Sequence, residues 1–101
     1  MGLFNVFQKE IAIDLGTANT IIIQNGKIVV DEPSIVAIDI KTDNIIAIGK
    51  KAQHMHGKTH ENIKTIRPLK DGVIADYKAT EAMIKGMIRM TQEKKSILSS
   101  L

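Results

Sequence analysis

Residues 11–20 read Ile-Ala-Ile-Asp-Leu-Gly-Thr-Ala-Asn-Thr, and this stretch decides the fold. Residues 11–15 predict a short buried strand with an acidic residue, Asp14, near its end, and residues 20–23 predict a second strand. The turn between them is made of small residues: Gly16, Thr17, Ala18 and Asn19. Because no large side chain is in the way, the backbone N–H groups of such a turn can converge on an anion. The stretch indicates either an anion-binding loop or a plain hairpin turn, which the same residues would also form.

Side chains in and beside the turn can add to an anion site. Thr17 carries a hydroxyl and Asn19 an amide, and both groups can donate hydrogen bonds. Asp14, at the strand end, could hold a magnesium ion through its waters, since that metal keeps much of its hydration shell.

The rest of the first half also predicts strands, at residues 27–30, 34–40 and 45–48. Asn25-Gly26 precedes the first of these, and Asn-Gly between β-branched runs is a strong hairpin signal, because both residues accept the positive φ of a type I′ turn. Short strands with tight links predict an antiparallel or mixed sheet.

In the second half of the chain, the spacing of the apolar residues changes from the period of strands to that of helices. Residues 50–56 predict a short helix, residues 57–72 are polar and irregular, and Asp76 is the expected N-cap of a helix that ends at about Gln92. One face of this helix is apolar and carries Ala79, Ala82, Met83, Gly86, Met87 and Met90. The pattern predicts an amphipathic helix that covers a sheet, with its methionines in the core.

Three motifs in order resemble the MreB-type bacterial actins. Residues 13–20 resemble the first phosphate motif of the actin, Hsp70 and sugar-kinase superfamily, in the form typical of that family. Residues 31–37 resemble the family's next strand, and residues 56–76 resemble its link into the first long helix. The likeness implies an N-terminal portion of such a protein. The expected fold is α/β, a partial actin-like (ribonuclease H-like) ATPase domain at residues 10–101, with a mixed sheet, a covering helix and an inserted subdomain at about residues 32–75.

The resemblance also implies a site. Gly16, Thr17, Ala18 and Asn19 would contact the phosphates of ATP, with Asp14 near a magnesium ion. The family's proteins are similar to weak ATPases, but their second phosphate loop, adenine pocket and catalytic acid are not found in these 101 residues. Enzyme activity therefore stays open, and no catalytic residue is assigned.

The resemblance further implies a cell-shape-determining, cytoskeletal function. MreB-like proteins form ATP-dependent filaments beneath the membrane that organise cell-wall synthesis. The implied partners are other copies of the chain, the inner face of the cytoplasmic membrane and the cell-wall elongation machinery. The implied location is cytoplasmic and peripheral at the inner membrane.

The N-terminal residues 1–9 are expected to be a membrane-binding tip. Leu3, Phe4 and Phe7 share one face of a potential helical turn and include both phenylalanines of the chain. Bulky apolar residues at a terminus favour insertion into a membrane interface. The alternatives are packing against the body of the protein and simple disorder.

Composition and spacing argue against several other functions. The chain has no cysteine, which excludes disulfides and thiolate metal sites, and no apolar run long enough to span a membrane. The basic stretch from Lys50 to Lys70 contains no aromatic residue, so no stacking platform for nucleic acid is expected. Residues 52–59 fit a relaxed Walker A pattern but do not follow a strand directly, which favours a helix end. The three histidines, His54, His56 and His60, do not share one helical face, so no metal site is expected there.

Two rival functions stay open. One is another ATPase of the same superfamily, such as a chaperone or kinase, against which residues 66–76 argue. The other is a stand-alone interaction module or remnant that binds no nucleotide.

Overall fold

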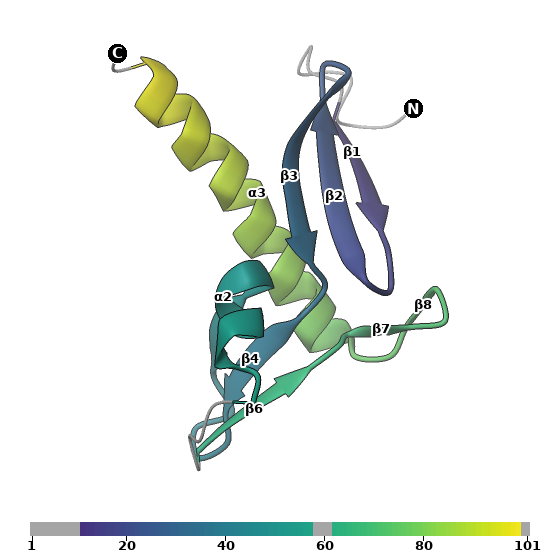
Figure 1. Ribbon diagram of the computed structural model, residues 1–101, viewed down its shortest axis with the longest axis vertical. Helices are drawn as coiled ribbons and strands as arrows, with labels where there is room; N and C mark the ends of the chain where they lie inside the picture. Colours follow the sequence, from purple (N-terminus) through teal and green to yellow (C-terminus); the bar gives the residue numbers. More distant parts are fainter. Residues whose placement is uncertain (1–10, 58–61, 100–101) are drawn as a thin grey trace.

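The computed structural model describes residues 11–57 and 62–99, which form three small antiparallel sheets and two helices (Figure 1). The strands are β1 (Ile11–Leu15), β2 (Asn19–Gln24), β3 (Lys27–Pro33), β4 (Val36–Asp39), β5 (Ile45–Ile48), β6 (Ile63–Ile66), β7 (Leu69–Lys70) and β8 (Val73–Ile74). The helices are α2 (Gly49–Met55) and α3 (Tyr77–Ser99). The predicted tip at residues 1–9 lies outside the described residues, and the bounds of the inserted subdomain stay a prediction.

The first sheet has the strand order β1-β2-β3. Its β2–β3 turn confirms the predicted hairpin, because Asn25 and Gly26 both have positive φ, at 53° and 78°. In β1 the aliphatic residues at 11, 13 and 15 are half-buried, while Ala12 and Asp14 are exposed. The prediction of a buried strand is therefore wrong for β1, since only one of its faces is covered.

The second sheet has the order β5-β4-β6, with β4 in its centre. The chain reaches it through a tight bend, in which the Ile35 N–H donates to the Pro33 carbonyl at 2.9 Å. The bend explains why the strand predicted to begin at Ser34 begins at Val36, whereas β3 extends to Pro33. Strand β4 ends at Asp39, one residue before the predicted end. Ala52 of α2 packs on this sheet, against Ile35 and Ala37.

Of the region at residues 57–72, which was predicted to be irregular, the described part from residue 62 onward is more regular than predicted. It contains β6, which pairs with β4, and β7, which pairs with β8 through the Asp71-Gly72 turn. The alternation in β6 extends over only four residues, beside Pro68, so periodicity alone does not separate it from a loop. Pairing with β4 supplies the hydrogen bonds that make it a strand.

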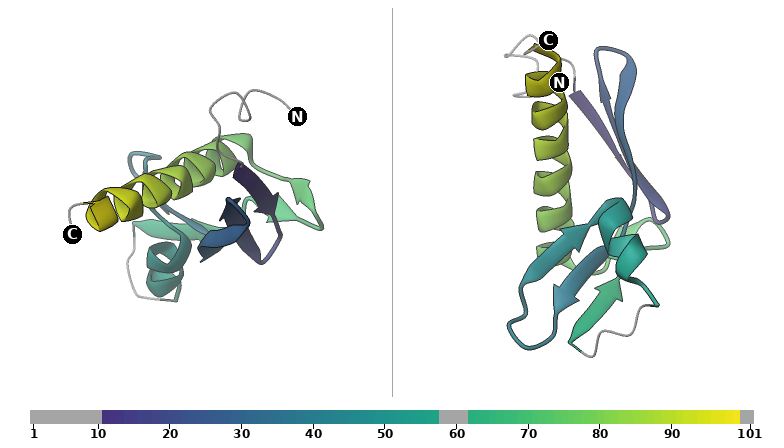
Figure 2. Two further views of the ribbon diagram at one scale, coloured as in Figure 1. Left: turned by 90° about the horizontal axis from the view of Figure 1, so that it is seen from above. Right: turned by 60° about the vertical axis from the view of Figure 1, so that its left-hand side comes forward.

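Helix α3 confirms the predicted amphipathic helix. The Asp76 carboxylate accepts a hydrogen bond from the Ala79 N–H at 2.9 Å, as an N-cap does. Met83 and Met87 are fully buried, in a core that β-strands of all three sheets share. Figure 2 shows α3 running along one side of the first two sheets. The helix continues to Ser99, beyond the predicted end at Gln92. No helix within the described residues has the length and apolarity needed to cross a bilayer.

Candidate phosphate-binding loop

The predicted anion-binding residues lie together in the loop that joins β1 to β2. The Gly16 N–H donates to the Asn19 carbonyl at 3.0 Å, which closes the turn. Thr17, Ala18 and Asn19 are exposed. Within the described residues, the backbone N–H groups of Thr17 and Ala18 donate no hydrogen bond. Two backbone donors of this turn are therefore without a partner among the described residues, and an anion could accept hydrogen bonds from them.

The bare backbone of Gly16 is a condition of this turn. An ideal Cβ built on Gly16 would lie 2.5 Å from the Asn19 carbonyl oxygen, closer than real Cβ atoms come to other atoms. A side chain at this position would force the turn open. Glycine here therefore preserves the geometry that the two free N–H groups depend on.

Ser34, the residue that follows β3, is completely buried and bonds to the loop. Its hydroxyl donates to the Gly16 carbonyl at 2.7 Å, so the Thr20 hydroxyl, 2.8 Å away, must donate to Ser34 Oγ. The Ser34 backbone N–H also donates to the Ala18 carbonyl, at 2.8 Å. One residue after β3 thus fixes three points of the loop and its following strand.

A second contact comes from the turn between β7 and β8. The Gly72 N–H donates to the Thr17 hydroxyl at 3.0 Å, and Figure 1 shows this turn beside the end of the β1–β2 hairpin. Because the Thr17 oxygen accepts this bond, its own proton remains available for an anion.

The predicted side-chain donors differ in their availability. Asn19 Nδ2 donates to Asp31 Oδ1 at 3.0 Å, so one of its two amide protons is already engaged. The exposed Asp14 carboxylate lies on the face of β1 opposite to the half-buried Ile13 and Leu15. Within residues 11–57 and 62–99, no three acidic, histidine or cysteine side chains gather for a metal ion. A single carboxylate fits a magnesium ion that keeps its water ligands, and does not make an all-protein metal cage.

Ser34 and Gly72 are the residues that sequence reasoning missed. Ser34 lies 18 positions from Gly16, and Gly72 lies 55 positions from Thr17. Ser34 belongs to the segment that resembles the family's next strand, but no local pattern indicates that its side chain turns toward the loop.

The Walker A-like run lies on α2 and its end, as predicted. Ala52 is buried inside this short helix, and the helix ends at Met55. Lys58 and Thr59 lie outside the described residues. His56 Nδ1 lies 2.6 Å from the Thr65 hydroxyl, and His54 is exposed.

Comparison with known proteins places this geometry in context. The family model described as MreB/Mbl protein matches residues 8–101. The chain is similar to the cell shape-determining protein Mbl of Bacillus cereus, with 53% identity over 90 residues that cover 88% of this chain and 27% of that protein. It is 46% identical over 89 residues to the cell shape-determining protein MreB of Escherichia coli, which covers 83% of this chain and 26% of that protein.

Two solved structures are also similar. MreB5 of Spiroplasma citri bound to ADP matches with a TM-score of 0.73 and 42% identity, over 83% of this chain and 26% of that one. The same organism's MreB 5 bound to AMPPNP matches with a TM-score of 0.70 and 46% identity, over 76% of this chain and 23% of that one. The chain spans about a quarter of the length of these relatives.

Proposed function

Because the chain belongs to the MreB/Mbl family and has part of its actin-like fold, we propose that it contributes the first phosphate-binding loop to the ATP site of a cell-shape-determining filament protein. The observation that carries this proposal is the loop at residues 16–19, whose free backbone N–H groups are held in place by Ser34. Family membership sets aside the chaperone and kinase rivals.

The chain's own groups suit nucleotide phosphates. The N–H groups of Thr17 and Ala18 would bind phosphate oxygens, and the Thr17 hydroxyl would donate a further bond. Asp14 would orient waters around a magnesium ion, which, when bound, neutralises phosphate charge. The nucleotide-bound Spiroplasma relatives support a nucleotide as ligand. Hydrolysis is not part of the proposal, because no catalytic residue is assigned to this chain.

The first test concerns assembly. A chimera is made in which residues 8–101 of this chain replace the matching segment of the Bacillus subtilis Mbl protein, to which the chain is 51% identical over 90 residues. We expect the chimera to sediment as filaments with ATP and magnesium, and much less without nucleotide. The proposed function makes self-association depend on an occupied ATP site. Parent Mbl is the matched control. Sedimentation that ignores nucleotide would contradict the proposal.

The second test concerns the membrane. We propose that the protein lies in the cytoplasm at the inner face of the membrane, where it would act with the cell-wall elongation machinery. The apolar side chains among residues 3–7 are the reason for proposing this location. Burying one phenylalanine is worth about 1.5–3 kcal/mol, so Phe4→Ala with Phe7→Ala should weaken liposome binding about tenfold or more. Cosedimentation measures the effect, with the exposed pair Ile28→Ala and Ile40→Ala as control. If the Phe4 and Phe7 double variant binds liposomes as strongly as the unmodified chain, the two side chains pack inside the protein and do not insert into the membrane.

A further inference from the structure

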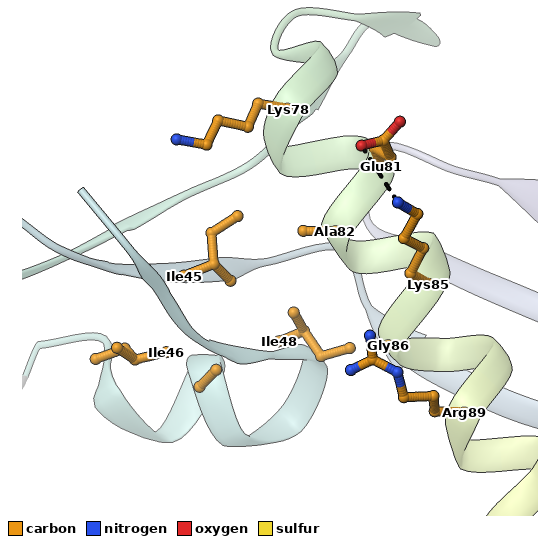
Figure 3. A pocket seen from close by; sticks show the side chains of 10 residues that line it. Ile45, Ile46, Ile48, Lys78, Glu81, Ala82, Lys85, Gly86 and Arg89 are labelled. Atoms are coloured by element: carbon orange, nitrogen blue, oxygen red, sulfur yellow. Dashed lines mark ion pairs between the residues drawn. The ribbon is translucent and has the colours of Figure 1, made fainter. Parts of the chain in front are cut away.

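A groove of about 450 Å³ lies between β5 and the first half of α3 (Figure 3), and no residue of the phosphate-binding loop lines it. Its apolar part comes from Ile45 and Ile48 of β5 and from Ala82 and Gly86 of α3. Gly86 has no side chain, and an ideal Cβ there would collide with Ile48 Cδ1. The bare backbone of Gly86 thus lets Ile48 pack directly against the helix, which forms the floor of the groove.

Charged side chains border this groove, and most are cationic. Lys78, Lys85 and Arg89 line it together with one acidic residue, Glu81. Lys85 pairs with Glu81 at 3.6 Å, and Lys78 pairs with Asp43 at 3.3 Å, all four side chains being largely exposed. No ion pair is found for Arg89 in the part of the chain that the structure describes. Exposed pairs contribute little stability, so the carboxylates of a ligand can displace them.

We propose that this groove binds a short acidic segment of another protein. Apolar side chains of the segment would lie between β5 and α3, and its carboxylates would contact Lys78, Lys85 and Arg89. Apolar anchors in a hollow, surrounded by complementary charge, are a usual arrangement for peptide recognition.

The same observations disfavour other occupants. A second copy would bring the same three cations against their equivalents, which is repulsive. A bilayer surface is met by protruding apolar side chains, whereas here the apolar groups line a hollow. Pairing of an extended segment with the edge strand β5 is also disfavoured. The β4–β5 register shifts at Ile46, and such a bulge twists a sheet edge away from further pairing.

The test uses the 101-residue chain and a fluorescein-labelled peptide of alternating Glu or Asp and Leu or Phe residues. We expect saturable binding in fluorescence anisotropy, weakened by added salt. A control peptide with Gln and Asn in place of the acids, and another with Ala in place of Leu and Phe, should each bind about tenfold more weakly or worse.

Two variants locate the binding. Lys78→Glu with Arg89→Glu should weaken binding about tenfold or more, whereas the matched change of net charge at Lys27→Glu with Lys64→Glu should leave it within about twofold. Ala82→Leu fills the groove without a charge change and should also weaken binding. Circular dichroism checks that each variant folds. On the unmodified chain, peptide-induced NMR shifts should centre on the amides of Ile46, Ala82 and Gly86.

Several results would overturn the proposal. These are an equal loss of binding in the Lys27 and Lys64 control, equal affinity for the amide peptide, and NMR shifts centred elsewhere. Phosphatidylglycerol vesicles that bind more tightly than the peptide, with the same dependence on Lys78 and Arg89, would replace the peptide partner by a membrane and would also overturn it.

Discussion

Gly16→Val should abolish nucleotide binding in the Mbl chimera. An ideal Cβ at Gly16 already lies 2.5 Å from the Asn19 carbonyl oxygen, so valine must open the turn and move the N–H groups of Thr17 and Ala18 away from the phosphates. Hydrogen bonds to charged groups are worth about 1.5–3 kcal/mol each, so the loss of two raises the Kd about a hundredfold or more. Calorimetry with ATP and magnesium measures the change.

The control for this variant is Gly26→Ala. An ideal Cβ on Gly26 has no heavy atom within 4 Å, although its φ is 78°. Alanine there strains one exposed turn by about 1–2 kcal/mol and leaves the loop at residues 16–19 intact. ATP binding that survives Gly16→Val and falls with Gly26→Ala would be the opposite of the expected result.

Ser34→Ala should lower the free energy of unfolding of the 101-residue chain by about 1–3 kcal/mol. The change removes the buried hydroxyl that bonds the Gly16 carbonyl and the Thr20 hydroxyl, and it leaves the latter buried without that partner. Urea unfolding followed by circular dichroism measures the loss. In the chimera the same change should also weaken ATP binding, because the loop is no longer fixed.

Thr42→Ala is the matched hydroxyl deletion. Thr42 Oγ1 accepts a hydrogen bond from the Asn44 N–H at 3.3 Å in an exposed turn, so its loss should change the free energy of unfolding by less than about 0.5 kcal/mol. If the two alanine variants unfold alike, Ser34 does not hold the loop.

Local chemistry was enough to predict several elements. Asn25-Gly26 specifies its turn through two positive φ angles, and Asp76 specifies the start of α3 through its cap. On the apolar face of α3, Met83 and Met87 are buried and Met90 is half-buried, because the 3.6-residue period places them toward the sheets. The fold class followed from these elements together with the resemblance to a family.

Contacts between residues far apart in the sequence could not be predicted from local sequence patterns. Strand β6 exists because β4 pairs with it, and the hydroxyl of Ser34 reaches Gly16 only after the bend at Pro33. Hydrogen bonds across such separations depend on tertiary packing, which composition and periodicity do not encode. The roles of residues 14 and 16–19 toward ATP and magnesium stay predictions.

The central claim is that the loop at residues 16–19 binds nucleotide phosphate as one part of a larger site. Its donors are exposed, and a tightly held ligand needs polar groups that surround it. Calorimetry of ATP with magnesium on the 101-residue chain and on the Mbl chimera tests this claim most directly. We predict weak binding to the chain alone and tight, Gly16-dependent binding to the chimera. Equally tight binding to both would contradict the claim of a partial site, and no binding to either would favour an interaction module without a nucleotide.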